Sequence, residues 1–372
     1  MGWRGRGLLL ADGGGATYTH AVPLPASDRA GKTMIEPTKS PSAGLRLVVI
    51  LPALNEQATV GDVIRRIPSR IAGVADVRAL VVDDGSSDAT QAEAEAAGAK
   101  VVSHGRRRGV GAAFQTGIGQ ALEMGADLIV SIDADGQFDP ATIPTLIAPV
   151  VAGDADFATA SRFADPRLAP KMPPIKRWGN RMMSRLVSHL AGQRFHDVSC
   201  GMRCYNRAAA LSLNAIAAFT YTQEVFLNLA FKGLRIVEVP IPVEGVRRHG
   251  DSRVANNLWR YGVNTLWILF RCYRDYRPMR LFGGMALAMM VPAVLLEVFL
   301  LVHYLRTGGF SPHKWAGFTG AALLTLGLLS LLMGLLGDML DRHRIYLEEV
   351  LYHVRKSNLG HQPLDHGDAD PR

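Results

Sequence analysis

Short runs of apolar residues alternate with helical patterns along the N-terminal part of the chain. Four such runs are found at Arg46–Pro52, Val77–Val82, Ala99–Ser103 and Asp127–Ile132. Strands that are apolar throughout and alternate with helices predict a parallel α/β sheet with both faces covered. Ligands of such sheets bind outside the carboxyl ends of the strands, so the residues that follow each run are the first candidates for a site.

Two longer apolar stretches follow, at about residues 281–305 and 315–340. Each exceeds the roughly 20 residues that span the hydrocarbon core of a bilayer. The connection between them is short, which predicts an antiparallel hairpin. Basic residues are concentrated outside the pair; they are Arg271, Arg274, Arg277 and Arg280 before it and Arg342, Arg344, Arg355 and Lys356 after it. By the positive-inside rule, both flanks are expected to be cytoplasmic.

Residues 254–278, just before the first stretch, combine apolar positions at helical spacing with several arginines. An amphipathic basic helix next to a spanning segment is typical of the membrane interface. The alternative is an ordinary core helix. Glu297 lies inside the first stretch, and we expect it either to pair with the second helix or to reach the interface at a tilted end.

The charge of the chain indicates which kind of partner it binds. The 372-residue chain has a formal net charge of +8, and much of this excess lies beside the apolar stretches. This placement favours anionic lipid as a partner. No aromatic-basic pattern or motif indicates DNA or RNA binding.

The three cysteines include no CxxC pair, which argues against structural disulfides.

The most informative acidic motif follows the fourth apolar run. Asp133 and Asp135 are two positions apart, so strand geometry places them on one face. Two carboxylates that converge favour a hard cation such as Mg²⁺ or Mn²⁺, which is often bound together with substrate phosphates. The motif therefore predicts a metal-dependent site for a diphosphate; an ordinary acidic turn is the alternative. The chain has neither a GxGxxG sequence after the first strand nor a P-loop.

Five motifs in order carry a resemblance to a known family. They are Pro52–Glu56, Val82–Ser86, Asp133–Gln137, Ser161–Phe163 and Asp197–Arg203. Together they resemble the family 2 glycosyltransferases of the GT-A fold, and more narrowly the branch of polyprenyl-phosphate (dolichyl-phosphate) hexose synthases. The resemblance covers roughly residues 45–255. Two departures are Cys200, inside the usual Ser-Gly pair, and Arg253, where a lysine is common.

The resemblance implies roles on the donor side. The nucleotide pocket would be formed by Pro52, Asn55, Glu56, Asp83, Asp84 and Gly111, with Asp84 and Asp83 accepting a hydrogen bond from the base. Asp133, Asp135 and Gln137 would hold Mg²⁺ or Mn²⁺ and the diphosphate, and the two aspartates would be catalytic through this metal. A strand-to-helix turn is the alternative interpretation of Asp83 and Asp84.

The resemblance also implies roles on the acceptor side. Arg162 and Arg177 would bind the phosphate of a lipid acceptor, and Arg181 shares a helix face with Arg177. A solvated basic face is the alternative for the two helical arginines. Asp197 and Glu224 would be sugar-facing catalytic carboxylates. Arg248, Ser252 and Arg253 resemble a loop that closes over the diphosphate. No catalytic base is assigned, because a lipid phosphate is already an anion.

The expected fold is therefore an α/β GT-A domain with a mostly parallel sheet, followed by an amphipathic interface helix and two transmembrane helices. The expected divisions are a disordered segment at 1–43, the glycosyltransferase domain at 44–253, the interface helix at 254–278, the transmembrane hairpin at 279–341 and a cytoplasmic tail at 342–372. The catalytic domain would face the cytoplasm from an inner (cytoplasmic) membrane, and homo-oligomerisation is left open.

The expected function is inverting transfer of a hexose from a UDP- or GDP-hexose to polyprenyl phosphate, with Mg²⁺ or Mn²⁺. One alternative is a glycolipid synthase with a hydroxyl acceptor, in which Asp197 or Glu224 would be an essential base. The other is a catalytically inactive membrane scaffold.

Overall fold

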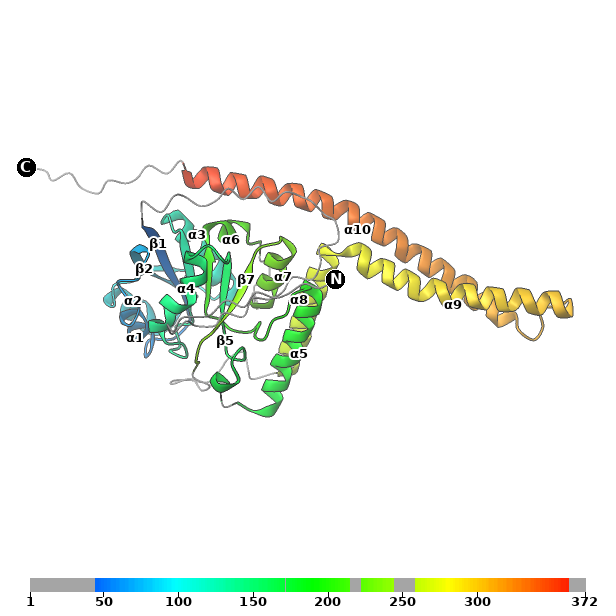
Figure 1. Cartoon of the computed structure of the whole chain (residues 1–372), viewed down its shortest axis with the longest axis horizontal. Helices are drawn as coiled ribbons and strands as arrows, with labels where there is room; N and C mark the ends of the chain where they lie inside the picture. The colour runs from blue at the N-terminus through cyan, green and yellow to red at the C-terminus, as the bar shows by residue number, and fades with distance from the viewer. Residues whose placement is uncertain (1–43, 171, 215–221, 244–257, 361–372) are drawn as a thin grey trace, which may run out of the picture.

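A seven-stranded sheet forms the centre of the N-terminal domain (Figure 1). The computed structural model describes residues 44–170, 172–214, 222–243 and 258–360. The predicted disorder at 1–43 lies outside these residues. The strands are β1 Leu45–Ala53, β2 Val74–Asp83, β3 Lys100–Ser103, β4 Leu128–Ser131, β5 Phe157–Ser161, β6 Arg203–Asn206 and β7 Ile236–Pro240. They lie in the order β3-β2-β1-β4-β6-β5-β7, which confirms the predicted α/β class.

All neighbouring strands pair in parallel except β6, which runs antiparallel to both β4 and β5. The predicted mostly parallel sheet is thus confirmed. The reversal follows from the connection into β6. Gln193, just after α5, lies at the start of β7, where its side chain donates to the Ile236 carbonyl. From there the chain passes Asp197 beside Glu238 and reaches the carboxyl edge, where β6 begins opposite Ser131, the last residue of β4. A strand that starts at this edge must run against its neighbours.

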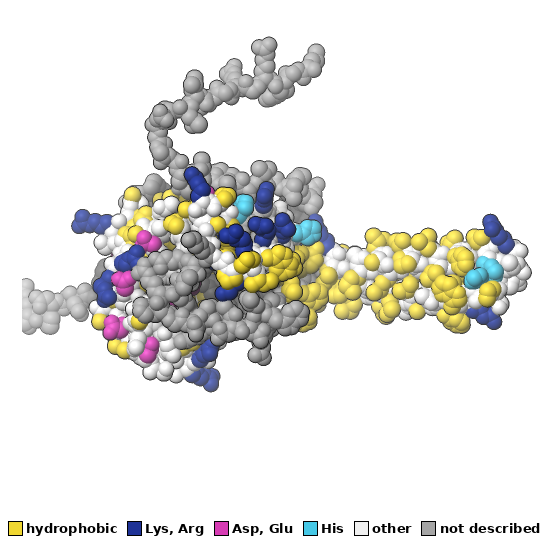
Figure 2. Space-filling view, turned by 90° about the horizontal axis from the view of Figure 1, so that it is seen from below, with side chains coloured by type: hydrophobic (Ala, Val, Ile, Leu, Met, Phe, Trp, Pro, Cys, Tyr) yellow, Lys and Arg dark blue, Asp and Glu magenta, His cyan; other side chains and the backbone are white. Residues whose placement is uncertain are grey.

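The helices are α1 Val60–Arg65, α2 Thr90–Ala96, α3 Val110–Glu123, α4 Ile143–Val151, α5 Pro174–Ala191, α6 Arg207–Ser212, α7 Thr222–Phe231, α8 Leu258–Tyr276, α9 Pro278–Thr307 and α10 Lys314–Gly360, with short 3-10 turns η1 Pro140–Thr142 and η2 Pro166–Leu168. Helices α9 and α10 are both long and apolar enough to cross a membrane. They form an antiparallel hairpin that projects from the domain as a rod with a largely hydrophobic surface (Figure 2).

Small residues of α10 allow the two helices of the hairpin to approach closely. A Cβ atom on Gly327 would lie 2.5 Å from Met290, and one on Gly320 would lie 2.6 Å from the Glu297 carboxylate. Close approach at glycine is a common way to pack helices in membranes. Of the two alternatives for Glu297, the structure shows contact with the second helix.

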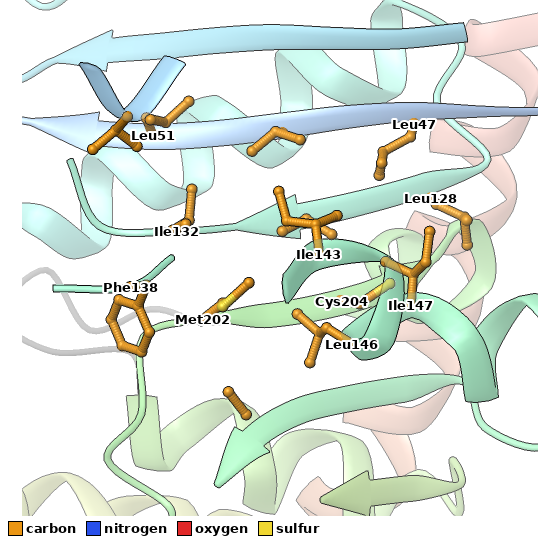
Figure 3. Packing of buried hydrophobic residues seen from close by; sticks show 14 of the residues in the cluster. Leu47, Leu51, Leu128, Ile132, Phe138, Ile143, Leu146, Ile147, Met202 and Cys204 are labelled. Atoms are coloured by element: carbon orange, nitrogen blue, oxygen red, sulfur yellow. The ribbon is translucent and has the colours of Figure 1, made fainter. Parts of the chain in front are cut away.

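Apolar side chains pack against both faces of the sheet. In β1, Leu47, Val49 and Leu51 point to the cluster formed with α1, α2 and α4 (Figure 3), whereas Val48 and Ile50 point to the cluster formed with α3, α5, α6 and α7. Successive strand residues alternate between faces, and here each face is covered by helices. This double coverage explains why β1 is apolar throughout.

Helix α10 continues as one helix far beyond the apolar stretch and packs on the domain. Its later turns contact α6 and α8, and no break occurs at residue 341, where the hairpin was expected to give way to a tail.

Glu348 accepts a hydrogen bond from Arg344 (2.8 Å) and lies 3.3 Å from the Lys232 ammonium. Burial lowers the pKa of Lys232, and the charge of Glu348 opposes this shift. The contact therefore joins the extension of α10 to the end of α7.

We expect Glu348→Gln to destabilise the protein by about 1–3 kcal/mol, because a largely buried ammonium loses its counter-charge. Thermal unfolding of the detergent-solubilised full chain, followed by tryptophan fluorescence, measures this change. Glu349→Gln is the matched control, since Glu349 is exposed, and it should change the stability by less than about 0.5 kcal/mol. Equal Tm values for the two variants would contradict the assignment.

Candidate active site

The loops that follow β1, β2 and β4 are tied together by side-chain hydrogen bonds. The Asn55 backbone N–H donates to Ser86 Oγ (2.9 Å), and Asn55 Oδ1 accepts from the Ser87 N–H (2.8 Å). Thr59 Oγ1 donates to the Ala134 carbonyl (2.7 Å). Asn55 has a φ of 53°, a left-handed conformation that asparagine tolerates better than most residues. The three loops therefore meet at one edge of the sheet, and they are the loops that the sequence assigns to the nucleotide and the metal.

Other predicted nucleotide residues lie around the same edge. Pro52 is half-buried near the end of β1, and the Glu56 backbone N–H donates to Thr90 Oγ1 (2.8 Å). Gly111 is buried in the first turn of α3. The structure thus brings these residues to the strand ends of β1 and β2 and to the start of α3.

Asp83 and Asp84 are buried and organise the neighbouring turns. The Asp83 carboxylate accepts from the Ser86 N–H (3.0 Å) and from Ser103 Oγ (2.9 Å). The Asp84 carboxylate accepts from the backbone N–H groups of Arg108 and Gly109, each at 2.8 Å. Both oxygens of each carboxylate are thus engaged by protein donors. This geometry agrees with the strand-to-helix turn interpretation, and the contact with a base stays a prediction.

His104 belongs to this turn and was missed by sequence reasoning, whereas Gly85 belongs to the Val82–Ser86 motif but had no role of its own. The His104 ring lies 2.9 Å from Asp84 Oδ1 through Nδ1 and 3.0 Å from Thr116 Oγ1 through Nε2. A Cβ on Gly85, whose φ is +80°, would lie 2.6 Å from the Arg106 backbone. The sequence offered one indication of His104 as a site residue, which is its position directly after the third apolar run.

The acidic loop after β4 presents the predicted metal ligands. Asp135 is buried, and its Oδ1 accepts from the Gln137 N–H (3.0 Å). Asp133 is half-buried against Gly201, where an added Cβ would lie 2.5 Å from Asp133 Oδ2. No group of three or more His, Cys, Asp or Glu that could hold a metal is found among the described residues. Two carboxylates and Gln137 fit a cation that takes its remaining ligands from substrate phosphates and water.

Arg162 and Asp197 form a buried bidentate pair. Arg162 Nε donates to Asp197 Oδ2 (2.6 Å), Nη2 donates to Oδ1 (2.9 Å), and the side chain of Asp197 is 0% exposed. Burial lowers the pKa of Arg162, but the charge of Asp197 and its hydrogen bonds, together with smaller contributions from Cys200 and Asp133, outweigh this, so the net shift is upward. Asp197 therefore positions Arg162 and does not face the site as an open carboxylate.

Glu238 on β7 holds the chain around Asp197 in place and was not identified from the sequence. Its Oε1 accepts from the Asp197 N–H (2.8 Å), and its Oε2 accepts from the His196 N–H (2.8 Å). The carboxylate is buried. Glu238 thus fixes the backbone that places Asp197 against Arg162.

A basic cavity of about 610 Å³ lies beside this pair. Its lining includes Arg177, Arg181 and Arg185 on α5, together with Arg194 and His196. Phe163, the residue after Arg162, also lines it. Arg177 and Arg181 thus line one cavity with Phe163 and His196, the chain neighbours of Arg162 and Asp197, whereas Arg162 itself is not among the lining residues. A shared phosphate contact of Arg162 and Arg177 stays a prediction.

Glu224 lines a second cavity, of about 930 Å³, together with residues of α8 and α10 such as Cys272 and Arg344. The preceding residue, Gln223, is buried and lies 3.4 Å from Ser199 Oγ, and the Ser199 N–H donates to Asp197. The role of Glu224 as a sugar-facing carboxylate stays a prediction. Arg248, Ser252 and Arg253 lie outside the described residues.

Comparisons with known proteins agree with this arrangement. The sequence model of Glycosyl transferase family 2 matches residues 48–212. A UDP-N-acetylglucosamine--dolichyl-phosphate N-acetylglucosaminyltransferase of Methanococcus voltae is 31% identical over 215 residues, 52% of this chain and 84% of that protein. An undecaprenyl-phosphate 4-deoxy-4-formamido-L-arabinose transferase of Pseudomonas paraeruginosa is 29% identical over 328 residues, 82% of this chain and 89% of that protein.

A solved structure shows the same fold. It is glucosyl-3-phosphoglycerate synthase from Mycobacterium tuberculosis, in complex with Mn²⁺ and UDP-glucose, with a TM-score of 0.51, 24% identity and coverage of 62% of this chain and 80% of that one. The fold and the loops at its carboxyl edge define a glycosyltransferase of the GT-A type. The chain belongs to glycosyl transferase family 2.

We expect Gly201→Ala to reduce the rate of sugar transfer by about a hundredfold, because the new Cβ would displace the Asp133 carboxylate, and displacements near 1 Å have such effects. Initial rates and thermal unfolding would be measured on the same preparations. Gly119→Ala in α3 is the control, since no atom lies within 4 Å of a Cβ there. A Gly201→Ala enzyme with full activity would show that Asp133 need not occupy this position.

Proposed function

We propose that the protein transfers a hexose from a nucleotide diphosphate sugar to polyprenyl phosphate, with inversion and with Mg²⁺ or Mn²⁺. The observation that carries this proposal is the arginine-lined cavity beside Arg162, at the end of the domain from which the hairpin leaves. Figure 2 shows Lys and Arg side chains gathered beside hydrophobic ones at that end. The two relatives are named for lipid-phosphate acceptors of the polyprenyl type.

On the donor side, Asp133, Asp135 and Gln137 would hold the metal. When bound, the metal would neutralise the charge that develops on the leaving diphosphate. The loops tied by Asn55 and Thr59 would receive the nucleotide. The aspartate pair at the strand end supports this assignment, as does the Asp133 carboxylate seated against Gly201.

On the acceptor side, the lipid phosphate would be the nucleophile. One of its oxygens forms a bond to the anomeric carbon as the bond from that carbon to the diphosphate breaks, which inverts the configuration. Guanidinium groups of Arg162, Arg177 and Arg181 would hold the phosphate, because their planar forks match its oxygens. An anionic nucleophile needs no general base.

The geometry disfavours the hydroxyl-acceptor alternative. That reaction needs a carboxylate base, and Asp197 is buried with both oxygens bonded to Arg162. Glu224 lines the other cavity. The bidentate contact with Arg162 therefore argues against Asp197 as the acceptor of a proton from a substrate hydroxyl.

The surface also supports a membrane location with the catalytic domain in the cytoplasm. Helices α5 and α8 both pack on α7. Each exposes large apolar side chains, which are Ile175, Trp178 and Met182 on α5 and Leu266, Trp267 and Phe270 on α8. Apolar side chains of this size beside arginines fit a bilayer interface. The arginines on both sides of the hairpin support a position of these helices at the cytoplasmic face by the positive-inside rule.

The decisive experiment is transfer of radiolabel from UDP-glucose, UDP-galactose, UDP-N-acetylglucosamine and GDP-mannose to undecaprenyl phosphate. We expect one donor to give a labelled lipid that is labile to mild acid, and we expect EDTA to abolish it and Mn²⁺ or Mg²⁺ to restore it. Label transferred only to a diacylglycerol acceptor would support the glycolipid synthase. Absence of nucleotide-sugar binding with Mn²⁺ would support the inactive scaffold.

Arg177→Gln should raise the KM for undecaprenyl phosphate about tenfold, because one charge-assisted contact to the phosphate is lost. The KM for the nucleotide sugar should not change. Lys176→Gln removes the same charge from the neighbouring residue, which does not line the cavity, and should leave both constants as they are. Equal effects of the two substitutions would indicate a general electrostatic contribution in place of a specific contact.

A further inference from the structure

His196 lies where the frame around Asp197 meets the basic cavity. Its ring Nδ1 is 2.8 Å from Glu238 Oε2, the oxygen that also accepts from the His196 backbone N–H. About a third of the side chain is exposed (32%), and the residue lines the cavity with Arg177 and Arg181. The ring is thus held from behind by β7 and open toward the cavity.

The hydrogen-bond pattern fixes which ring nitrogen is available. An ionised carboxylate can only accept, so Nδ1 carries the hydrogen that bonds to Glu238. None of the described residues forms a hydrogen bond with Nε2. When the ring is protonated, Nε2 carries a hydrogen as well and becomes a second donor. The cavity would then contain a cationic N–H donor that is anchored more rigidly than the arginine side chains.

The charges around the ring determine its protonation. The hydrogen bond to Glu238 raises the pKa of His196, burial opposes this, and Arg194 also lowers the pKa. Arg177, Arg181 and Arg185 face the cavity from α5, Asp165 and Arg167 pair with each other on η2, and the adjacent Arg162 is neutralised by Asp197. Glu238 is the acidic group in direct contact with the ring. A dianionic ligand in the cavity would favour the protonated form further.

We propose that His196 is a further acceptor-binding residue, whose Nε2–H donates to the phosphate of the polyprenyl phosphate within the basic cavity. The inference rests on the proposed function. It adds a phosphate ligand, His196, that lies outside the five sequence motifs. Glu238 links the two halves of the contact, because it holds His196 and also the backbone of Asp197, which binds Arg162. The phosphate is therefore held by one connected frame of β5, β7 and α5.

The assignment has a pH consequence with a definite sign. As the pH rises through the raised pKa of His196, Nε2 loses its hydrogen and stops donating, so affinity for the acceptor falls. The second ionisation of the phosphate, near pH 6, works in the opposite direction because it adds negative charge. A comparison of wild type with a His196 variant at the same pH separates the titration of His196 from that of the phosphate, because the phosphate ionises equally with both proteins.

The test is His196→Asn, whose amide can still donate to Glu238 but places nothing at the Nε2 position. The KM for undecaprenyl phosphate should rise about tenfold at pH 6, as for the loss of one charge-assisted hydrogen bond, and the ratio of variant to wild type should approach one by pH 8.5. The KM for the nucleotide sugar and kcat should not change. His189→Asn is the control, since His189 is exposed on α5 and lies outside the cavity.

A pH-independent loss of kcat together with a lower Tm would show a merely structural role and overturn the inference, as would a KM equal to that of the wild type at every pH. Equilibrium binding of farnesyl phosphate, with farnesol as the neutral comparison, provides a readout that does not need turnover. Tighter binding of farnesyl phosphate by wild type than by His196→Asn at pH 6, without any lipid product, would reject the proposed reaction and keep the phosphate site. Equal binding by both proteins would reject the site itself.

Discussion

The buried contact between the Asp197 carboxylate and the Arg162 guanidinium is the interaction on which the proposed acceptor side of the site depends. Asp197 is removed from water, so its charge must be matched by donors, and Arg162 and the Ser199 N–H provide them. Removal of one partner from such a pair typically costs about 3–5 kcal/mol, because the other charge stays buried. Arg162 is consequently fixed in orientation, and its remaining N–H groups are directed by the protein instead of by solvent.

The same physical principle operates on the donor side. Asp83 and Asp84 end a buried strand, where the chain turns and leaves backbone N–H groups without partners in the sheet. Their carboxylates accept from these groups, and Asp84 also contacts His104. An acidic residue at a strand end can therefore organise a turn as well as bind a ligand. The pattern of acidic residues alone does not separate the two roles. In the loop after β4, Asp133 is seated against Gly201, and Thr59 holds the backbone between Asp133 and Asp135.

The parts of the fold that could be predicted from the sequence are those set by local pattern. The apolar runs identified β1 to β4, and the two long apolar stretches identified α9 and α10, because burial on both faces or in lipid leaves a continuous signal. The antiparallel β6 was not predicted, since its direction depends on where residues 195–202 lie in space. Glu238 and His196 were missed for a related reason. Glu238 contacts Asp197 across 41 residues of chain, and His196 meets the arginines of α5 only at a cavity, so neither relation leaves a periodic trace in the sequence.

The hydrophobic pattern of the sequence did not show that the helix continues past the expected boundary between hairpin and tail at residue 341. The geometry of α10 explains this. Its 47 residues span about 70 Å, well beyond the hydrocarbon core of a bilayer. Apolar composition ends near residue 340, but helical structure does not, because the later turns bury Arg344 and Glu348 against α7 and α8 instead of against lipid. In the proposed membrane arrangement, this one continuous helix connects the hairpin directly to the domain. It would hold the arginine-lined cavity at a defined depth relative to the headgroups, where a polyprenyl phosphate presents its charge.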